Sequence, residues 1–293
     1  MNRINQTVLM SSARFFSNEQ QINPYYGDHT VDLEAAIAEH EGLKAMLQQA
    51  GIEVTQVDAP SDSQDGVYTA NWALIRGSKA VLARLPDARK SEEDWAEAQL
   101  RRLGVEVVRV PEDWHFSGQG DSLPCGEYLF AGQGYRSDPR AQIFAADTLG
   151  YELVQLRTVP LLDEAGQPVT NASSGWPDSF YYDLDLALSV VRPPEGSTKG
   201  ILAFCPQAFS SDSVDKLRSL SEVFELIEVS EDEATKAFAC NLVSTGSTVI
   251  MSANAPRLKA DLESRGLTTL TPRVVELAKG GGFIRCQTLS FND

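Results

Sequence analysis

The feature that most constrains the fold is a pattern that occurs five times along the chain. In each copy a helical run passes through a tight turn into an alternating run that is typical of a strand. The five copies are LQQAGIEVTQV (47–57), LRRLGVEVVRV (100–110), ADTLGYELVQL (146–156), LSEVFELIEV (220–229) and LESRGLTTLTP (262–272). The turn residue is glycine in the first, second, third and fifth copies, where a left-handed helix C-cap favours it, and it is Phe224 in the fourth copy. Their spacing is too long for a solenoid and suits a supersecondary unit.

Between these copies lie further short runs that are rich in β-forming residues. They span residues 8–13, 67–75, 79–85, 127–132, 200–205, 239–251 and 283–291. Two strands, a helix and a strand, repeated five times, can close radially, because each unit then buries its sheet against its neighbours and leaves its helix outside. We therefore expect one α/β domain over residues 1–293, a five-bladed α/β propeller of five ββαβ units around a pseudo-fivefold axis. The polar segment 163–179 is expected to be a loop inserted between the third and fourth units.

The composition excludes several classes of partner. The chain has 25 basic and 41 acidic residues, a net charge of −16, which repels phosphate backbones and anionic membranes. Neither nucleic acid nor a membrane is therefore an expected partner, and no run approaches the roughly 18 apolar residues of a membrane span. The four cysteines are scattered without the spacing of a zinc or disulfide site, which favours a reducing, cytoplasmic location.

The end of the chain carries the strongest candidate for chemistry. In GGGFIRCQTLSF, residues 280–291, three glycines lead into an apolar, strand-like run with Cys286 in its middle. Free cysteines are often buried as small hydrophobic residues, so Cys286 is either core or a nucleophile that the glycines allow a substrate to approach. Cys205 and Cys240 are flanked by apolar residues and are expected in the core, and Cys125 follows a proline in a loop.

Four polar segments carry residues that are unusual for the inner strands of such a propeller. They are QDGVYTAN (64–71), HFSGQGDSLP (115–124), GYRSD (134–138) with YYDLDLAL (181–188), and GGGFIRCQTL (280–289). In this order they resemble the amidinotransferase/hydrolase superfamily known as penteins, which includes arginine deiminases, dimethylarginine dimethylaminohydrolases and glycine amidinotransferases. The resemblance covers nearly the whole chain. It implies a five-bladed α/β propeller with a cysteine at the axis that attacks the central carbon of a guanidinium group.

The resemblance also implies roles for individual residues. Cys286 matches the family's nucleophile, and Arg84 and Arg136 match arginines that hold the substrate's α-carboxylate. Asp65 and Asn71 lie in the segment that contacts the guanidinium, and many relatives have a carboxylate where Asn71 stands. No metal or organic cofactor is expected, because thiol chemistry on a guanidinium needs none.

Two positions depart from the family pattern, and both concern proton transfer. Asp185 matches the second residue of the family's His-x-Asp strand, but Asp183 stands where the acid/base histidine should be. Ser117 replaces the usual Glu or Asp before Gly-x-Gly-Asp. An aspartate can do the work of that histidine only if burial and a neighbouring like charge raise its pKa by several units. In a strand, Asp183 and Asp185 would share one face.

Three histidines elsewhere in the chain are candidates for the missing acid/base group. His40 lies on the apolar stripe of a helix, which favours packing in the core or an interface. His29 lies in a loop, where a histidine is usually solvated. His115 is the best substitute, because strand alternation would place it on the same face as Ser117.

These observations predict a cytoplasmic, cysteine-dependent hydrolase, or an amidinotransferase, that acts on a guanidino compound related to arginine with weakened or altered activity. The alternative is a non-catalytic pentein that binds a small molecule or a protein partner. Thiol reactivity distinguishes the two, because a binding protein has no need for a reactive cysteine. The oligomeric state stays open, with a homodimer as a possible assembly.

Overall fold

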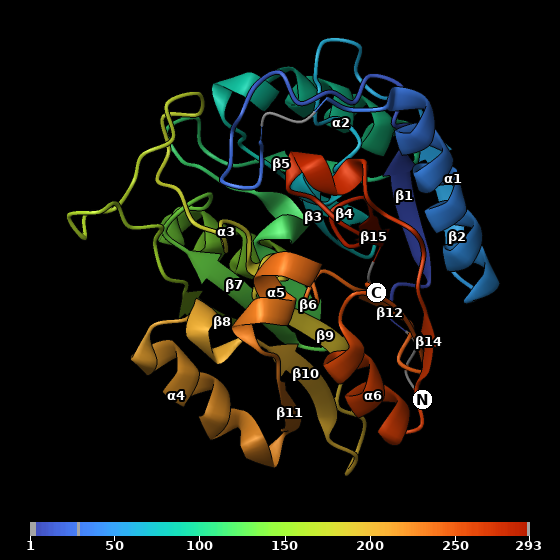
Figure 1. The fold of residues 1–293 in the computed structure, drawn as a ribbon, viewed down its shortest axis with the longest axis vertical. Helices are drawn as coiled ribbons and strands as arrows, with labels where there is room; N and C mark the ends of the chain where they lie inside the picture. Colours follow the sequence, from blue (N-terminus) through green and yellow to red (C-terminus); the bar gives the residue numbers. More distant parts are fainter. Residues whose placement is uncertain (1–3, 28–29, 292–293) are drawn as a thin grey trace.

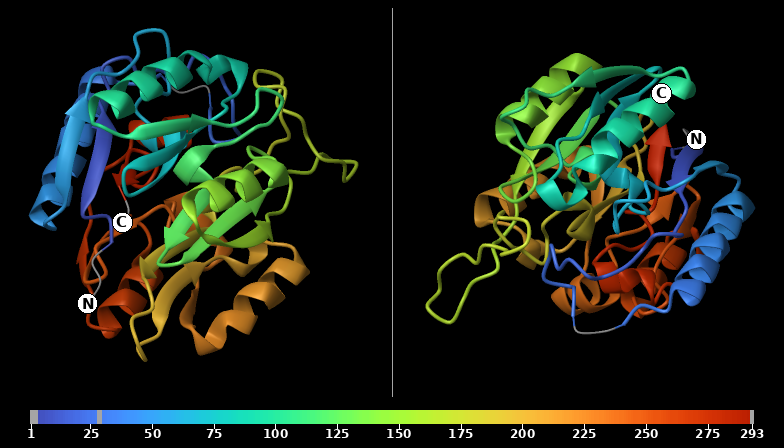
Figure 2. Two further views of the ribbon diagram at one scale, coloured as in Figure 1. Left: turned by 180° about the vertical axis from the view of Figure 1, so that it is seen from behind. Right: turned by 90° about the horizontal axis from the view of Figure 1, so that it is seen from above.

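The computed structural model describes residues 4–27 and 30–291 and shows five three-stranded sheets around a common centre (Figure 1, Figure 2). The strands are β1 Thr7–Ser11, β2 Glu53–Val57, β3 Ala73–Arg76, β4 Lys79–Leu82, β5 Glu106–Arg109, β6 Ser122–Cys125, β7 Tyr128–Gln133, β8 Glu152–Arg157, β9 Leu188–Arg192, β10 Gly200–Phe204, β11 Phe224–Glu228, β12 Val243–Ser244, β13 Thr248–Ile250, β14 Thr268–Leu270 and β15 Leu289–Phe291. The helices are α1 Leu33–Gln49, α2 Ser91–Arg102, α3 Pro139–Leu149, α4 Ser211–Ser219, α5 Glu231–Ala237 and α6 Pro256–Ser264.

Each sheet repeats one topology. Its central strand pairs antiparallel with one neighbour and parallel with the strand that follows a helix, as β4 does with β3 and β5. A parallel pair needs a crossover, and α1, α2, α3, α4 and α6 supply it on the outside of the ring (Figure 1). At the end of α3, Gly150 has a φ of 73°, the left-handed cap that the sequence pattern predicted. The five-unit α/β propeller is therefore confirmed.

The first unit is completed from the far end of the chain. Strand β15 pairs antiparallel with β1, with Leu9 opposite Leu289, and β1 pairs parallel with β2. The two ends of the chain therefore share one sheet, which closes the ring. Because β15 directly follows the turn that holds Cys286, this closure also positions the cysteine.

Three segments that were predicted as strands are turns or single 3₁₀ turns instead. Residues 67–72, 181–187 and 283–288 all precede a short strand at the inner end of a unit. Side chains rather than neighbouring strands satisfy part of their backbone: Asp121 accepts the N–H of Leu184, and Asn241 accepts the N–H of Cys286. The chain can therefore leave the sheets at the axis without unpaired amide groups.

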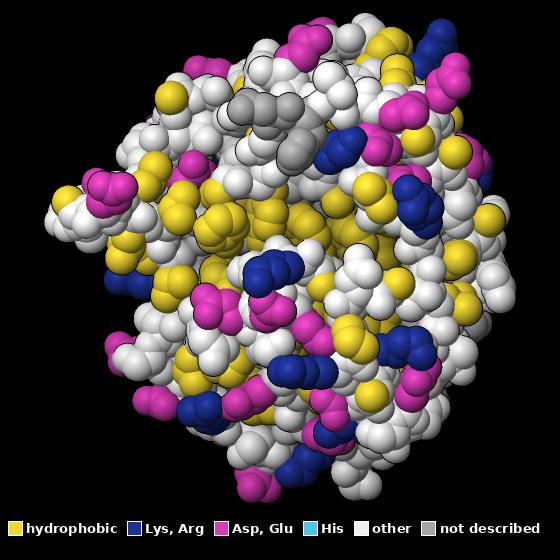
Figure 3. Space-filling view, in the orientation of Figure 1, with side chains coloured by type: hydrophobic (Ala, Val, Ile, Leu, Met, Phe, Trp, Pro, Cys, Tyr) yellow, Lys and Arg dark blue, Asp and Glu magenta, His cyan; other side chains and the backbone are white. Residues whose placement is uncertain are grey.

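The surface shows two further features. The segment predicted as an insertion forms a loop that protrudes from the ring between β8 and β9 (Figure 1, Figure 2). On the face in Figure 3, hydrophobic side chains gather in a central hollow, and charged side chains surround it. Among the described residues, none of the helices has both the length and the apolar character to cross a membrane.

Candidate active site

A pocket near the axis brings together polar residues from several units of the ring. It is a narrow, partly open cavity. Six of the nine residues that the sequence singled out line it, together with Asn23, Arg89 and Tyr182. The six are Asp65, Asn71, Ser117, Arg136, Asp183 and Cys286.

Cys286 presents its thiol from the turn before β15 and is only 2% exposed. The amide Nδ2 of Asn241 donates to Sγ over 3.1 Å, and the thiol donates to Oδ2 of Asp185 over 3.4 Å. Oδ1 of Asn241 accepts the backbone N–H groups of Arg285 and Cys286, at 2.8 and 3.2 Å. Asn241 therefore fixes both the turn and the position of the sulfur.

The thiol is protonated at neutral pH. Burial, and after it the charge of Asp185, raises the pKa of Cys286 well above its ordinary value. The hydrogen bond from Asn241 acts in the opposite direction, because a donor stabilises the thiolate. A base must therefore accept the thiol proton before the sulfur can attack an electrophile.

The three glycines before Cys286 serve packing as much as substrate access. A Cβ on Gly282 would lie 2.3 Å from the ring of Tyr68, and one on Gly281 would lie 2.4 Å from Oδ1 of Asn23. Gly281 also has a φ of 81°, which disfavours any side chain. The glycine run predicted room for a substrate, whereas much of that room is filled by the protein's own side chains.

Asp183 is held by two hydrogen bonds inside the pocket. Nδ2 of Asn71 donates to its Oδ2 over 2.6 Å, and Oγ of Ser117 donates to its Oδ1 over 2.8 Å. Burial raises the pKa of Asp183, whereas the charge of Arg136 and these two hydrogen bonds lower it. The carboxyl closely approaches the backbone of Gly120, where a Cβ would lie 2.7 Å from Oδ2. Asp183 is therefore a fixed group with an elevated pKa, as an acid/base residue requires.

The orientation of Asn71 follows from a buried ion pair. Arg89 donates to Oδ1 of Asn71 over 2.8 Å and pairs with Glu92 through contacts of 2.7 Å. Since the amide oxygen faces Arg89, the NH₂ group must face Asp183 and Ser117. Glu92 is in turn fixed by hydrogen bonds from Ser63 and Trp72.

Asp183 and Asp185 face different directions, which corrects the prediction that they share one face of a strand. Asp183 is the extended residue that precedes the 3₁₀ turn Leu184–Leu186, and Asp185 lies inside that turn, so the two are not in a strand. Asp183 lines the pocket, while Asp185 receives the thiol hydrogen bond and lines a second cavity. Burial and the charge of Asp183 raise the pKa of Asp185 well above its ordinary value.

Arg136 is a buried cation that forms no ion pair with the acidic residues that the structure describes. Its guanidinium lies 5.4 Å from the ring centre of Trp176 and 5.0 Å from that of Tyr182, and it donates to the carbonyl of Ile22. Among the described residues, its Nε has no hydrogen-bond partner and no carboxylate lies within 4.0 Å. Such a group can bind the carboxylate of a ligand.

Known proteins share both this sequence and this fold. The family described as eukaryotic N,N-dimethylarginine dimethylhydrolase matches residues 12–169. Over 97% of its length the chain is 31% identical to N(G),N(G)-dimethylarginine dimethylaminohydrolase of Mycobacterium tuberculosis, covering 85% of that protein. The chain belongs to the dimethylarginine dimethylaminohydrolase family.

Two further relatives connect the family to arginine. The bifunctional arginine dihydrolase/ornithine cyclodeaminase AgrE of Nostoc is 30% identical over 96% of this chain, which spans only 37% of AgrE. The crystal structure of the substrate-bound N-terminal domain of ArgZ, a cyanobacterial arginine dihydrolase, superposes with a TM-score of 0.84 at 27% identity and covers 98% of both chains. The dimethylarginine dimethylaminohydrolase family and these relatives are thus hydrolases of guanidino groups.

The structure corrects the prediction for Arg84. Its Nη1 pairs with Glu93 over 2.9 Å and its Nε donates to the carbonyl of Val110 over 3.0 Å. It lines a neighbouring cavity rather than the one that contains Cys286. Because Glu93 already neutralises this guanidinium, Arg84 has a structural role and does not bind the carboxylate of a substrate.

The prediction for His115 is also wrong. The segment around it is not a strand, so His115 does not share a face with the buried Ser117. Its exposed ring stacks on Trp176 at a centroid distance of 4.2 Å, in the same cavity as Arg84. His40 is buried in the packing of α1, where burial lowers its pKa to about 4. His29 lies outside the described residues.

Two residues of the site were missed by the sequence analysis. Asn241 is a polar residue within an apolar run, ACNLV, and this contrast was an available signal. Arg89 lies five residues after Arg84, and the sequence offers no means of choosing between them. Within the described residues, no group of three His, Cys, Asp or Glu side chains is arranged to hold a metal ion.

Proposed function

We propose that this protein is a cysteine-dependent hydrolase of a guanidino compound that also carries a carboxylate, such as arginine or a methylated arginine. The observation that carries this proposal is the Cys286 thiol, hydrogen-bonded to Asn241 and Asp185, in a pocket that also contains carboxyl groups and an unpaired arginine. The activities of the relatives, on dimethylarginine and on arginine, support the same class of substrate.

The charges of the pocket suit the two ends of such a substrate. Burial raises the pKa of Asp65 to about 6, so this carboxyl is still mostly ionised at neutral pH and can attract a guanidinium. Arg136, held between two aromatic rings, suits the α-carboxylate. A substrate held at both ends has its central carbon fixed in the pocket, which favours attack by a nearby nucleophile.

The chemistry requires two proton transfers in each half of the reaction. Cys286 loses its proton to Asp185 and forms a bond to the guanidinium carbon, and the C–N bond to the leaving amine breaks as that amine takes a proton from Asp183. Water then adds to the thiouronium carbon while Asp183 accepts its proton. Cleavage of the C–S bond gives a protonated urea, which loses its proton to solvent, and the sulfur recovers its own proton from Asp185. Asn71 and Ser117 hold Asp183 throughout.

A second function is favoured by one observation, the protonated thiol that donates to a buried acid. Without a histidine, the protein can bind a guanidino compound and turn it over slowly or not at all. We propose this binding role as the alternative. A cytosolic location, which suits four buried free cysteines, and a homodimer stay predictions that fractionation and light scattering can check.

The deciding experiment measures turnover of arginine, monomethylarginine and asymmetric dimethylarginine by the purified protein. Ammonia or methylamine release, together with a urea product, identifies the bond that is cleaved. Cys286→Ser serves as the control, because it keeps the hydrogen bonds of the site and removes the nucleophile. Saturable binding without any product from the wild-type protein would establish the binding role and overturn the hydrolase.

A further inference from the structure

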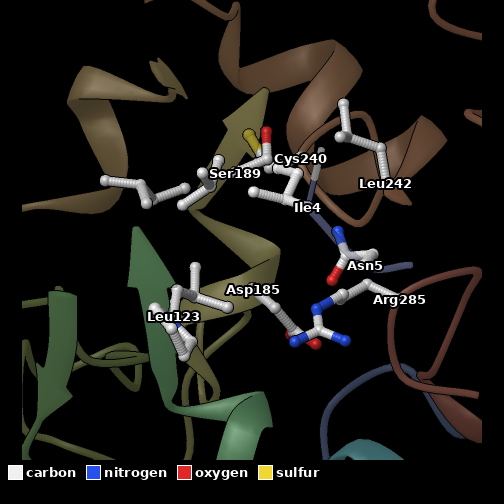
Figure 4. Close-up of a pocket in the computed structure, with 11 residues that line it drawn as sticks. Ile4, Asn5, Leu123, Asp185, Ser189, Cys240, Leu242 and Arg285 are labelled. Carbon is white, nitrogen blue, oxygen red and sulfur yellow. The ribbon is translucent and has the colours of Figure 1, made fainter. Parts of the chain in front are cut away.

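A second cavity is lined by Asp185 and Arg285 (Figure 4). Because Asp185 also accepts the hydrogen bond of Cys286, which lines the substrate pocket, Asp185 lies between the two cavities. The space in which the centre of a water molecule can lie measures about 20 Å³, and the cavity shares no lining residue with the pocket of Cys286. In units three and four the chain passes the first pocket at Ser117 and Asp183, and it then reaches the second cavity at Leu123 and Ser189. The two cavities therefore lie at successive depths along the inner strands.

The inner end of this cavity is polar and its outer end is partly exposed. Asp185 and Arg285 extend into it from two different segments, as Figure 4 shows. Ile4 and Val190, by contrast, are partly exposed, so the cavity leads toward the protein surface. A cavity of this size with several polar groups can hold water.

The two oxygens of Asp185 have different surroundings. Oδ2 accepts the hydrogen bond of the Cys286 thiol. Oδ1 is buried and has no hydrogen-bond partner among the described residues. A buried carboxyl oxygen without a partner is costly, and water in the adjoining cavity would satisfy it. Arg285 makes no ion pair within 4.0 Å in the described part of the chain, and it donates instead to Gln119, Thr288 and Ser290.

We propose that Asp185 is a proton relay between the Cys286 thiol and water in this second cavity, so that the thiol proton leaves on the side opposite the substrate. This inference rests on the proposed nucleophilic role of Cys286. It assigns to the second cavity a function in thiol activation, with water as its ligand. Arg285 is a positioning residue, because its charge lies beside the relay and its hydrogen bonds anchor the turn of Cys286.

The relay balances without any rotation of the carboxyl group. In the resting state the proton of the neutral acid lies on Oδ1, because Oδ2 is occupied as an acceptor. As sulfur bonds to the substrate carbon, its proton passes to Oδ2 and the proton on Oδ1 passes to cavity water. When the C–S bond later breaks, Oδ2 returns a proton to the sulfur and water returns one to Oδ1. The proton content of Asp185 is the same before and after each step.

The test measures alkylation of Cys286 by 2-chloroacetamidine between pH 6 and 10, in wild type, Ser189→Val and Ser189→Ala. Valine adds methyl groups to the lining of the cavity, whereas alanine removes the hydroxyl and leaves the space for water. With the relay, the wild-type and alanine rates stay nearly level below the pKa of the thiol. The valine variant should be at least about 10-fold slower at pH 6.5, with a rate that rises about tenfold per pH unit, so that its difference from wild type narrows steadily toward pH 10.

A merely structural effect of valine would lower the rate at every pH, which overturns the relay. A wild-type rate that itself rises tenfold per pH unit overturns it too. If Ser189→Val does not fold, Leu242→Phe fills the same cavity from another segment, with Leu242→Ala as its control. Alkylation needs no turnover, so a protein that shows the relay profile but hydrolyses no guanidino compound would refute only the proposed function.

Discussion

Replacing Asp183 with asparagine separates the chemical role of this carboxyl from its structural role. Asparagine has nearly the same shape, and its oxygen can still accept the hydrogen bond from Asn71. Its NH₂ group then faces Oγ of Ser117, which rotates to accept instead of donating. One hydroxyl proton loses its acceptor, which costs about 0.5–1.5 kcal/mol of folding free energy.

The expected loss of activity is larger than this loss of stability. A positioned acid/base group contributes about 10²-fold or more to the rate, or roughly 2.7 kcal/mol of barrier. We therefore expect kcat/KM for the best guanidino substrate to fall at least about 10²-fold. Alkylation of Cys286 by iodoacetamide should stay the same or become faster, because the charge of Asp183 is one of the groups that raise the pKa of the thiol, after burial and Asp185.

The assay is steady-state turnover, with urea denaturation and the alkylation rate measured on the same preparations. Turnover within about threefold of wild type would refute the reasoning and would assign the proton transfers to another group, such as Asp65. Turnover and alkylation that fall together would show that the variant disturbs the position of Cys286 rather than proton transfer at the leaving group.

Three further predictions follow from the same contacts. Asp183→His combined with Ser117→Glu restores the family's acid/base pair and should raise turnover about 10²-fold, unless a binding assay shows that the larger side chains block the pocket. Asp65→Asn removes a carboxyl whose pKa is raised from 3.8 to about 6 in the folded protein, and ionising that carboxyl costs the wild type about 3 kcal/mol of unfolding free energy as the pH rises from 3 to 7. The unfolding free energy of the variant, measured against that of wild type, should therefore increase by about 3 kcal/mol over the same pH range. Gly282→Ala should lose about 1–3 kcal/mol in urea denaturation, because its Cβ meets the ring of Tyr68, and an unchanged midpoint would contradict this packing.

The fold could be predicted because its information is local and repeated. In four copies the turn after the helix needs a residue at positive φ, so its glycine can be recognised in each copy by itself. Five copies of the unit together imply that the units close into a ring. What the repeat could not reveal is that the first unit borrows β15 from the far end of the chain. That pairing joins residues almost a whole chain length apart, and no local pattern specifies it.

Site residues could be predicted from the sequence where no neighbouring residue of the same type competed for the same role. Cys286, Ser117 and Asp183 were all singled out, and the structure brings the three together. Arg84 and Arg89 lie in the same segment, and the choice between them depends on which acid folds against which guanidinium, Glu93 or Glu92. Such pairing depends on the packing of the helix against the sheet, which sequence spacing does not contain.

The buried acids also explain how the pocket can distinguish a substrate from its product. Burial raises the pKa of both Asp183 and Asp185, and the charge of Asp183 raises that of Asp185 further, so these acids tend to hold protons while no cationic ligand is bound. A guanidinium brings a positive charge that stabilises the ionised form of such acids, so its binding favours proton release. The urea product is neutral, and the acids take up protons again when it forms. The charge of the substrate therefore makes Asp183 a stronger acid toward the leaving amine and helps Asp185 pass the thiol proton onward, which offsets part of the loss of the histidine.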